Sequence, residues 1–304
     1  MIAESITGGF VLANRNLKLV FIHIVVSVLN IAGMLVFLLL PLIVVAAYLG
    51  FDLEQAREAL PVLMHSPLEF LSRYFVIAIL SGISLIVYLT LSSLLIMYAL
   101  GGTLGILRRS EVDRGFSFRL SDFFREAGAH FVRLLWTASL VLLGALLLII
   151  ACMITWGVAS AVLHSIAAPG SKVELFFSTF GTLSAFTIIA VISVSGFIFT
   201  LYSMVIAVSE RKGAGEALPM TFRLLTGSIR PLILFLILFA AAVAVNAVWY
   251  GIQLSLALSP FLLPLTWIAG AFLQGYLSIV VWGSLISYYM KHVNQRAGLD
   301  SYEI

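Results

Sequence analysis

Long stretches without a charged residue divide this sequence. Asp, Glu, Lys and Arg are absent from Leu19 to Phe51, Tyr74 to Leu107, Leu134 to Ser171, Leu175 to Ser209 and Pro231 to Met290. An apolar stretch of about 18 residues is long enough to cross a bilayer as a helix. The composition agrees, since 62% of residues are hydrophobic, only 10% are charged and the mean hydropathy is +1.14. These features predict an all-α integral membrane protein.

The last uncharged stretch is too long for one crossing and is interrupted by Pro260 and Pro264. It therefore predicts two helices joined by a tight turn, which brings the total to six transmembrane helices in one membrane domain, residues 1–304. The predicted spans are 19–45, 76–104, 134–160, 178–206, 231–257 and 264–290.

Basic residues predict the orientation of these spans. Lys and Arg are retained on the cytoplasmic side of short loops, and all but three of the 17 fall in segments on one side. The three exceptions are Arg57, Arg73 and Lys172. We therefore expect both termini to be cytoplasmic and the protein to lie in the inner membrane of a cell. The net charge of +3 follows the membrane borders, which favours anionic lipid headgroups over nucleic acid as the partner.

Three stretches that precede spans mix basic with apolar residues, as interfacial helices do. They are Ile6 to Leu17, Leu120 to Arg133 and Ala217 to Arg230. In the second, Phe123, Phe124, Ala127 and Phe131 recur at helical spacing, while Glu126 and His130 fall on other faces. The candidate headgroup contacts are Arg15, Lys18, Arg119, Arg125, Arg133, Arg223 and Arg230.

The three stretches match in character, which suggests three copies of one unit: a surface helix followed by a hairpin of two spans. The alternative is that any basic amphipathic helix before a span has this appearance. On the opposite side, Asp52 to Leu60 predicts a helix in the loop from Phe51 to Arg73. That helix either lies on the membrane surface or docks a partner.

No residue pattern indicates catalysis, a metal site or a cofactor. The five histidines are scattered, the single cysteine, Cys152, lies inside a span, and the acids Asp122 and Glu126 are interpreted as balancing nearby arginines at a surface. Intramembrane ionisable groups are the usual functional signal, and His23 is the one histidine clearly within a span. His23, His130 and Glu126 form the only set that an embedded enzyme could use.

Amide side chains provide the other candidate site. Asn246, Gln253 and Gln274 lie in the adjacent fifth and sixth predicted spans. Buried amides in lipid hydrogen-bond to neighbouring helices, so these residues either hold the two helices together or line a cavity for a polar headgroup or solute.

One segment resembles part of a known bacterial family. It reads Val208-Ser209-Glu210-Arg211-Lys212-Gly213-Ala214-Gly215-Glu216-Ala217-Leu218 and continues with Thr221-Phe222-Arg223-Leu224-Leu225-Thr226-Gly227. It resembles the uncharacterised six-span membrane domain that occurs alone or fused to some glycerophosphodiester phosphodiesterases. The resemblance implies a bacterial inner membrane and proximity to phospholipid metabolism, and it transfers no catalytic residue, because the phosphodiesterase activity belongs to a separate soluble barrel.

A second resemblance is to the permease subunits of ABC importers, whose cytoplasmic loop begins Glu-Ala-Ala. Glu216-Ala217 begins similarly, but position 218 is Leu and Gly227 comes too late. The sequence thus predicts a non-catalytic, lipid-associated membrane protein, a scaffold or accessory component of envelope lipid handling. The alternative is a transporter or channel subunit with a polar site between spans five and six.

Overall fold

The computed structural model describes residues 1–48, 61, 64–66, 75–113, 115–166, 171–256 and 263–300, and this part of the chain is helical with no strand. The predicted outer-loop helix at Asp52 to Leu60 and the turn at Pro260 lie outside the described residues. The elements are α1 Ile2–Arg15, α2 Lys18–Met34, the π-helix η1 Leu35–Leu39, α3 Leu40–Tyr48, α6 Phe75–Val112, α7 Leu120–Ile166, α8 Lys172–Ser209, α9 Ala214–Gly227, α10 Arg230–Leu256 and α11 Leu263–Asp300.

The prediction of six membrane-crossing helices is confirmed. Within the described residues, the helical segments long and apolar enough to cross a membrane are Lys18–Val44, Ala78–Val112, Leu120–Leu163, Leu175–Ser209, Arg230–Leu256 and Leu265–Val293. The first contains a π-helical turn, Leu35–Leu39, that ends two residues before Pro41. A proline inside a helix lacks the N–H and clashes with the carbonyl four residues earlier, so the wider turn accommodates it.

Two of the predicted surface helices are separate and one is not. A break at Asn16 ends α1, and Ser228, in an extended conformation, ends α9. The stretch 120–133, in contrast, is the start of α7, which continues through its span to Ile166. Nothing in that stretch interrupts the helix, because it holds no proline and its one glycine, Gly128, lies within the helix.

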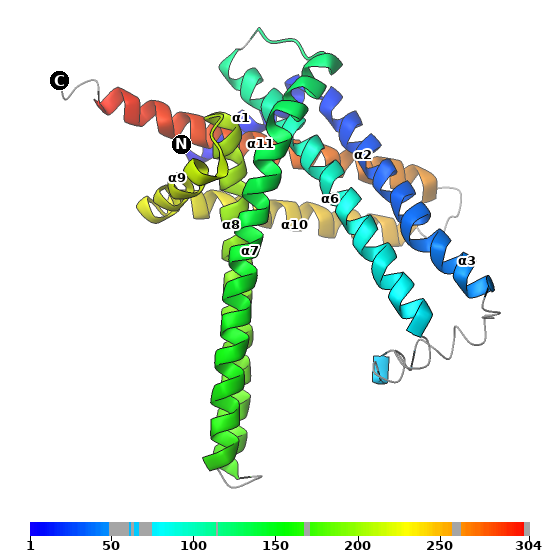
Figure 1. Ribbon diagram of the computed structural model, residues 1–304. Coiled ribbons are helices and arrows are strands. Elements are labelled where there is room, and N and C mark those ends of the chain that lie inside the picture. The colour runs from blue at the N-terminus through cyan, green and yellow to red at the C-terminus, as the bar shows by residue number, and fades with distance from the viewer. Residues whose placement is uncertain are drawn as a thin grey trace.

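Buried residues gather where one end of every spanning helix meets the others. We call this region the hub: residues 99–110 of α6, 123–137 of α7, 198–209 of α8, 231–238 of α10 and 279–289 of α11, the start of α2, and the helices α1 and α9. Away from the hub, three helix hairpins point in different directions, as Figure 1 shows. They are α2–α3 with α6, α7 with α8, and α10 with α11. The outer parts of these hairpins expose apolar side chains to the surroundings, as lipid-facing helices do.

Hydrogen bonds join the helices within the hub. Tyr202 donates to the carbonyl of Pro231 at 2.7 Å, Ser203 donates to Thr221 at 3.0 Å, and Arg108 Nε donates to the carbonyl of Ser209 at 2.8 Å. Lipid tails are as apolar as leucine, so helices in a membrane associate through close packing and such polar contacts rather than through the hydrophobic effect.

Helices α1, α9 and the first part of α7 each pack on the second helix of a hairpin other than the one that follows them. The first part of α7 contacts α6, α9 contacts α8, and α1 contacts α11. Glycines allow this approach: a Cβ on Gly102 of α6 would overlap the ring of Phe123, and a Cβ on Gly9 of α1 would lie 2.6 Å from the carbonyl oxygen of Val280. The contacts close into a ring, in the order that three repeated units would require.

Candidate functional site

A pocket between α10 and α11 brings together all three predicted amides. Asn246 and Gln253 of α10 and Gln274 of α11 line it, together with Trp249, Tyr250, Trp267, Gly270 and Ala271, around about 390 Å³ of space. Residues at spacings of three and four lie on one face of a helix, so α10 presents 246, 249, 250 and 253 to the same side on which α11 presents 267, 270, 271 and 274.

The amides hydrogen-bond across the helix pair. Gln274 Nε2 donates to Asn246 Oδ1, and Asn246 Nδ2 donates to the carbonyl of Ala242 on its own helix at 2.8 Å. Asn246 is therefore oriented by both helices. Asn246 and Gln274 thus form a contact between the two helices, and Asn246, Gln253 and Gln274 line one pocket.

Trp249 carries an unpaired donor at this pocket. Its Nε1 is buried and has no hydrogen-bond acceptor among the described residues. The indole lies over Gly270, since a Cβ on that glycine would lie 2.7 Å from Nε1. A buried N–H without an acceptor is costly in a membrane, so the site has a donor for which the described part of the chain supplies no partner.

An adjoining pocket shares Asn246 and Gln274 with the first. It lies on the hub side of the amide pair, encloses about 270 Å³ and is lined mainly by apolar residues of α8, α10 and α11, among them Phe197, Phe239 and Trp282. Ring contacts organise one wall, with Phe235 at 6.1 Å from Phe197 and 5.8 Å from Phe239 between ring centroids. The amide pair thus separates a polar pocket from an apolar one.

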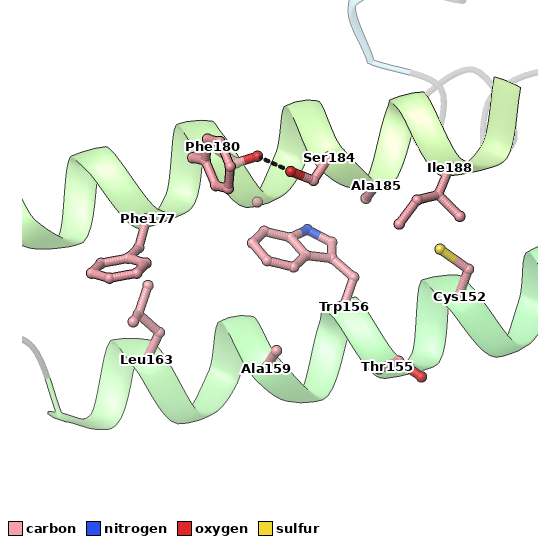
Figure 2. Close-up of a pocket in the computed structure, with 11 residues that line it drawn as sticks. Cys152, Thr155, Trp156, Ala159, Leu163, Phe177, Phe180, Ser184, Ala185 and Ile188 are labelled. Carbon is pink, nitrogen blue, oxygen red and sulfur yellow. Dashed lines mark hydrogen bonds between the residues drawn. The ribbon is translucent and has the colours of Figure 1, made fainter. Parts of the chain in front are cut away.

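The groove between α7 and α8 is larger and has a different character. It encloses about 550 Å³ and its lining is almost entirely apolar. Figure 2 shows the indole of Trp156 in the space between the two helices, with Phe177 and Leu163 at one end and Cys152 with Ile188 at the other. The hydroxyl of Ser184 in this lining donates to the carbonyl of Phe180 at 2.8 Å, and that of Thr155 donates to the carbonyl of Ala151 at 2.8 Å.

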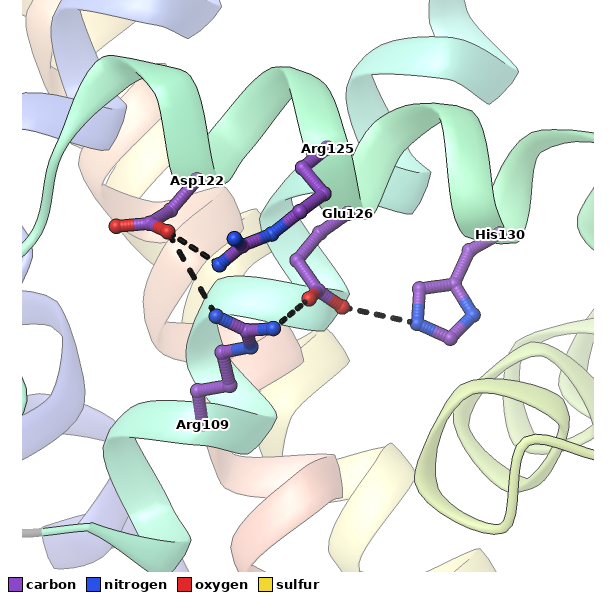
Figure 3. A network of polar contacts seen from close by, with 5 residues as sticks. All are labelled: Arg109, Asp122, Arg125, Glu126 and His130. Atoms are coloured by element: carbon purple, nitrogen blue, oxygen red, sulfur yellow. Dashed lines mark hydrogen bonds and ion pairs between the residues drawn. The ribbon is translucent and has the colours of Figure 1, made fainter.

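A buried charge network joins α6 to α7 in the hub (Figure 3). Arg109 NH2 lies 2.5 Å from Glu126 Oε1, and its NH1 lies 3.7 Å from Asp122 Oδ1. Glu126 Oε2 contacts His130 Nε2 at 3.2 Å, and Arg125 pairs with Asp122 at 2.6 Å. Glu126 is 3% exposed and His130 1% exposed.

The network corrects the interpretation of Glu126 as a surface charge. The buried face of this part of α7 is Phe123, Glu126, Ala127 and His130, whereas Phe124, predicted on that face, is 52% exposed. Gly105 of α6 makes room for Glu126, because a Cβ there would lie 2.6 Å from Glu126 Cβ. The sequence did contain a signal for this burial. Glu126 and His130 follow Phe123 by three and seven residues, a spacing that places all three on one face of a helix.

The set nominated for an embedded enzyme is not assembled. His23 Nε2 lies 3.2 Å from Thr103 Oγ1 of α6, whereas Gly101 and Gly105 of α6 contact Glu126 and His130. Residues two apart on a helix point to opposite sides, so α6 separates His23 from the other two. Among the described residues there is also no group of three His, Cys, Asp or Glu placed to hold a metal ion.

The predicted headgroup contacts lie on the hub helices or directly beside them in the chain. Their side chains are exposed except for Arg133, which is half-buried; the exposed ones are Arg15, Lys18, Arg119, Arg125, Arg223 and Arg230. Comparison with protein-family models, curated proteins and solved structures found no match for this chain. The resemblance to the phosphodiesterase-associated membrane domain therefore stays a prediction.

Proposed function

We propose that this multi-pass protein is a non-catalytic, lipid-associated component of a bacterial inner membrane, a scaffold or accessory in envelope lipid handling. The proposal rests on the division of the molecule into a part with exposed basic side chains and a part with exposed apolar side chains. Exposed cations lie on the hub helices or directly beside them in the chain, while the hairpins beyond the hub expose apolar side chains. Anionic headgroups suit the first region and acyl chains the second.

The basic hub also supports an orientation. Residues at the rim of the hub include Lys18, Arg119 and Arg230, whereas Lys172 begins α8 at the end far from the hub. By the positive-inside rule, the hub would face the cytoplasm and both termini would lie on that side, where the inner leaflet carries the anionic lipids.

Replacing Arg119, Arg125 and Arg133 together with glutamine is expected to weaken retention of phosphatidylglycerol. Each basic residue near an anionic surface contributes about 1 kcal/mol, and the ion pair of Arg125 with Asp122 reduces its share, so the expected loss is roughly tenfold to a hundredfold in apparent affinity. Native mass spectrometry of the purified protein with added phosphatidylglycerol measures it.

Two controls accompany this triple variant. Lys172→Gln removes an exposed charge far from the hub, and phosphatidylcholine replaces the anionic lipid; neither change should reproduce the loss. Equal phosphatidylglycerol retention by the triple variant and the unaltered protein would contradict the proposal.

The polar pocket favours a second candidate, a transporter or channel subunit. The amide pair between two adjoining pockets is the observation behind it. On this alternative, Asn246→Ala should abolish flux of a small uncharged solute, such as glycerol, in proteoliposomes. Solute-independent leakage, or flux equal in the variant and the unaltered protein, would count against it.

A further inference from the structure

The two pockets that share Asn246 and Gln274 together match a single amphiphilic molecule, because one pocket is polar and the other is apolar. The pocket farther from the hub is lined by amides and by Trp249, Tyr250 and Trp267, and the nearer one by phenylalanines and Trp282. Asn246 is 16 residues beyond the start of α10 at Arg230, which is roughly 24 Å along the helix. The polar pocket therefore lies toward the membrane boundary opposite the hub, where tryptophan and tyrosine accumulate.

This order matches a lipid of the leaflet opposite the hub. Such a lipid has its head at that boundary and its chain directed toward the bilayer centre, which is also the direction from the polar to the apolar pocket. The apolar pocket encloses about 270 Å³, below the range of about 300–1,000 Å³ for whole small-molecule sites. It therefore suits one acyl chain rather than two.

The residues that line the polar pocket favour a lipid head that is uncharged and carries hydroxyl groups. Among the described residues, no charged one lines the polar pocket, and a phosphate or carboxylate there would be desolvated without a counter-charge. Amide groups both donate and accept, as hydroxyl groups do. The buried Nε1 of Trp249 lacks an acceptor among the described residues and lies against Gly270. A hydroxyl oxygen of a ligand would satisfy it once the indole turns away from that glycine.

Extending the proposed lipid association, on which this inference rests, we propose that α10 and α11 bind a single-chain lipid with an uncharged, hydroxyl-bearing head. The head hydroxyls contact Asn246, Gln253 and Gln274 and accept the hydrogen bond of Trp249 Nε1. The chain occupies the pocket beside Phe197 and Phe239. Because the amide pair stands between the two pockets, the ligand passes beside it or displaces it.

The test uses 1-oleoylglycerol titrated into the purified full chain and followed by native mass spectrometry. One bound molecule is expected above the non-specific background. Trp249→Phe keeps an aromatic ring but removes the N–H together with the five-membered ring that carries it, and Asn246→Leu removes the amide; each should weaken binding about tenfold, the equivalent of one hydrogen bond of about 1.4 kcal/mol. Oleate, with a similar chain and a charged head, should bind at least tenfold more weakly.

Trp156→Phe is the matched control, since it alters the groove between α7 and α8 and should leave binding unchanged. If Trp249→Phe lowers the unfolding temperature, Gln253→Leu at the same pocket replaces it. Equal binding of oleate, or undiminished binding to the variants, would overturn the inference. Phosphatidylglycerol retention, measured on the same samples, depends on the hub arginines and not on this pocket. A negative result for the proposed function can therefore be distinguished from a negative result for this site.

Discussion

Replacing Arg109 with methionine is expected to lower the free energy of unfolding by about 3–5 kcal/mol, the usual cost of removing one partner from a buried ion pair. Arg109 supplies the cation for Glu126, a carboxylate that is 3% exposed between α6 and α7. Without the arginine, His130 is the remaining contact recorded for that carboxylate. Thermal unfolding in detergent and steric trapping in bicelles both measure the loss.

A double-mutant cycle provides the control for Arg109. Glu126→Leu alone leaves Arg109 with only the longer contact to Asp122, at 3.7 Å, and should also destabilise. The double variant, Arg109→Met with Glu126→Leu, removes both charges, and replacing a buried pair by apolar residues is often neutral. We expect the double variant to be more stable than either single variant. Additive losses would contradict the assignment of the pair as a buried contact.

Gly9→Leu is expected to separate α1 from α11 and to destabilise the hub by about 3 kcal/mol or more, because overpacking alone costs about 1–3 kcal/mol. A Cβ at this position would lie 2.6 Å from the carbonyl oxygen of Val280 and 2.7 Å from the nitrogen of Ser284. Both are backbone atoms, which a rotamer change cannot move aside. Faster proteolysis of the N-terminus and a lower unfolding temperature would report the separation.

Gly128→Leu is the matched control for Gly9. This glycine also lies within a helix, but nothing lies within 4 Å of a Cβ placed on it. Leucine has a higher helix propensity than glycine by about 0.5–1 kcal/mol, so this variant should be as stable as the unaltered protein or slightly more stable. Equal destabilisation by both substitutions would show that helix propensity or chain insertion, and not the contact with α11, dominates.

Much of the fold could be predicted because the cost of a charge in hydrocarbon acts on each residue separately. The uncharged stretches predicted six spans, and the described residues hold six helical segments that are long and apolar enough to cross a membrane. Asn246, Gln253 and Gln274 could be nominated for the same reason, since an amide in a lipid-embedded helix needs a partner. The structure shows that all three line one pocket.

The hub could not be predicted in the same way. Glu126 was expected at the surface because it is a charged residue among arginines, and it is buried because Arg109 and Gly105, on another helix, provide a counter-charge and space. His23 was grouped with His130 because both lie near the same membrane border, but α6 stands between them. The unpaired Nε1 of Trp249 depends on the position of Gly270 across the helix pair.

The sequence by itself determined which segments enter the membrane and which residues border it, because transfer into lipid depends on the composition of each segment. Only the tertiary structure decided which faces of the spans meet. A spanning helix is apolar on all sides, and lipid tails are as apolar as leucine, so hydrophobic periodicity does not mark the contact face. Glycine contacts and interhelical hydrogen bonds select it, and these depend on pairs of residues far apart in the chain.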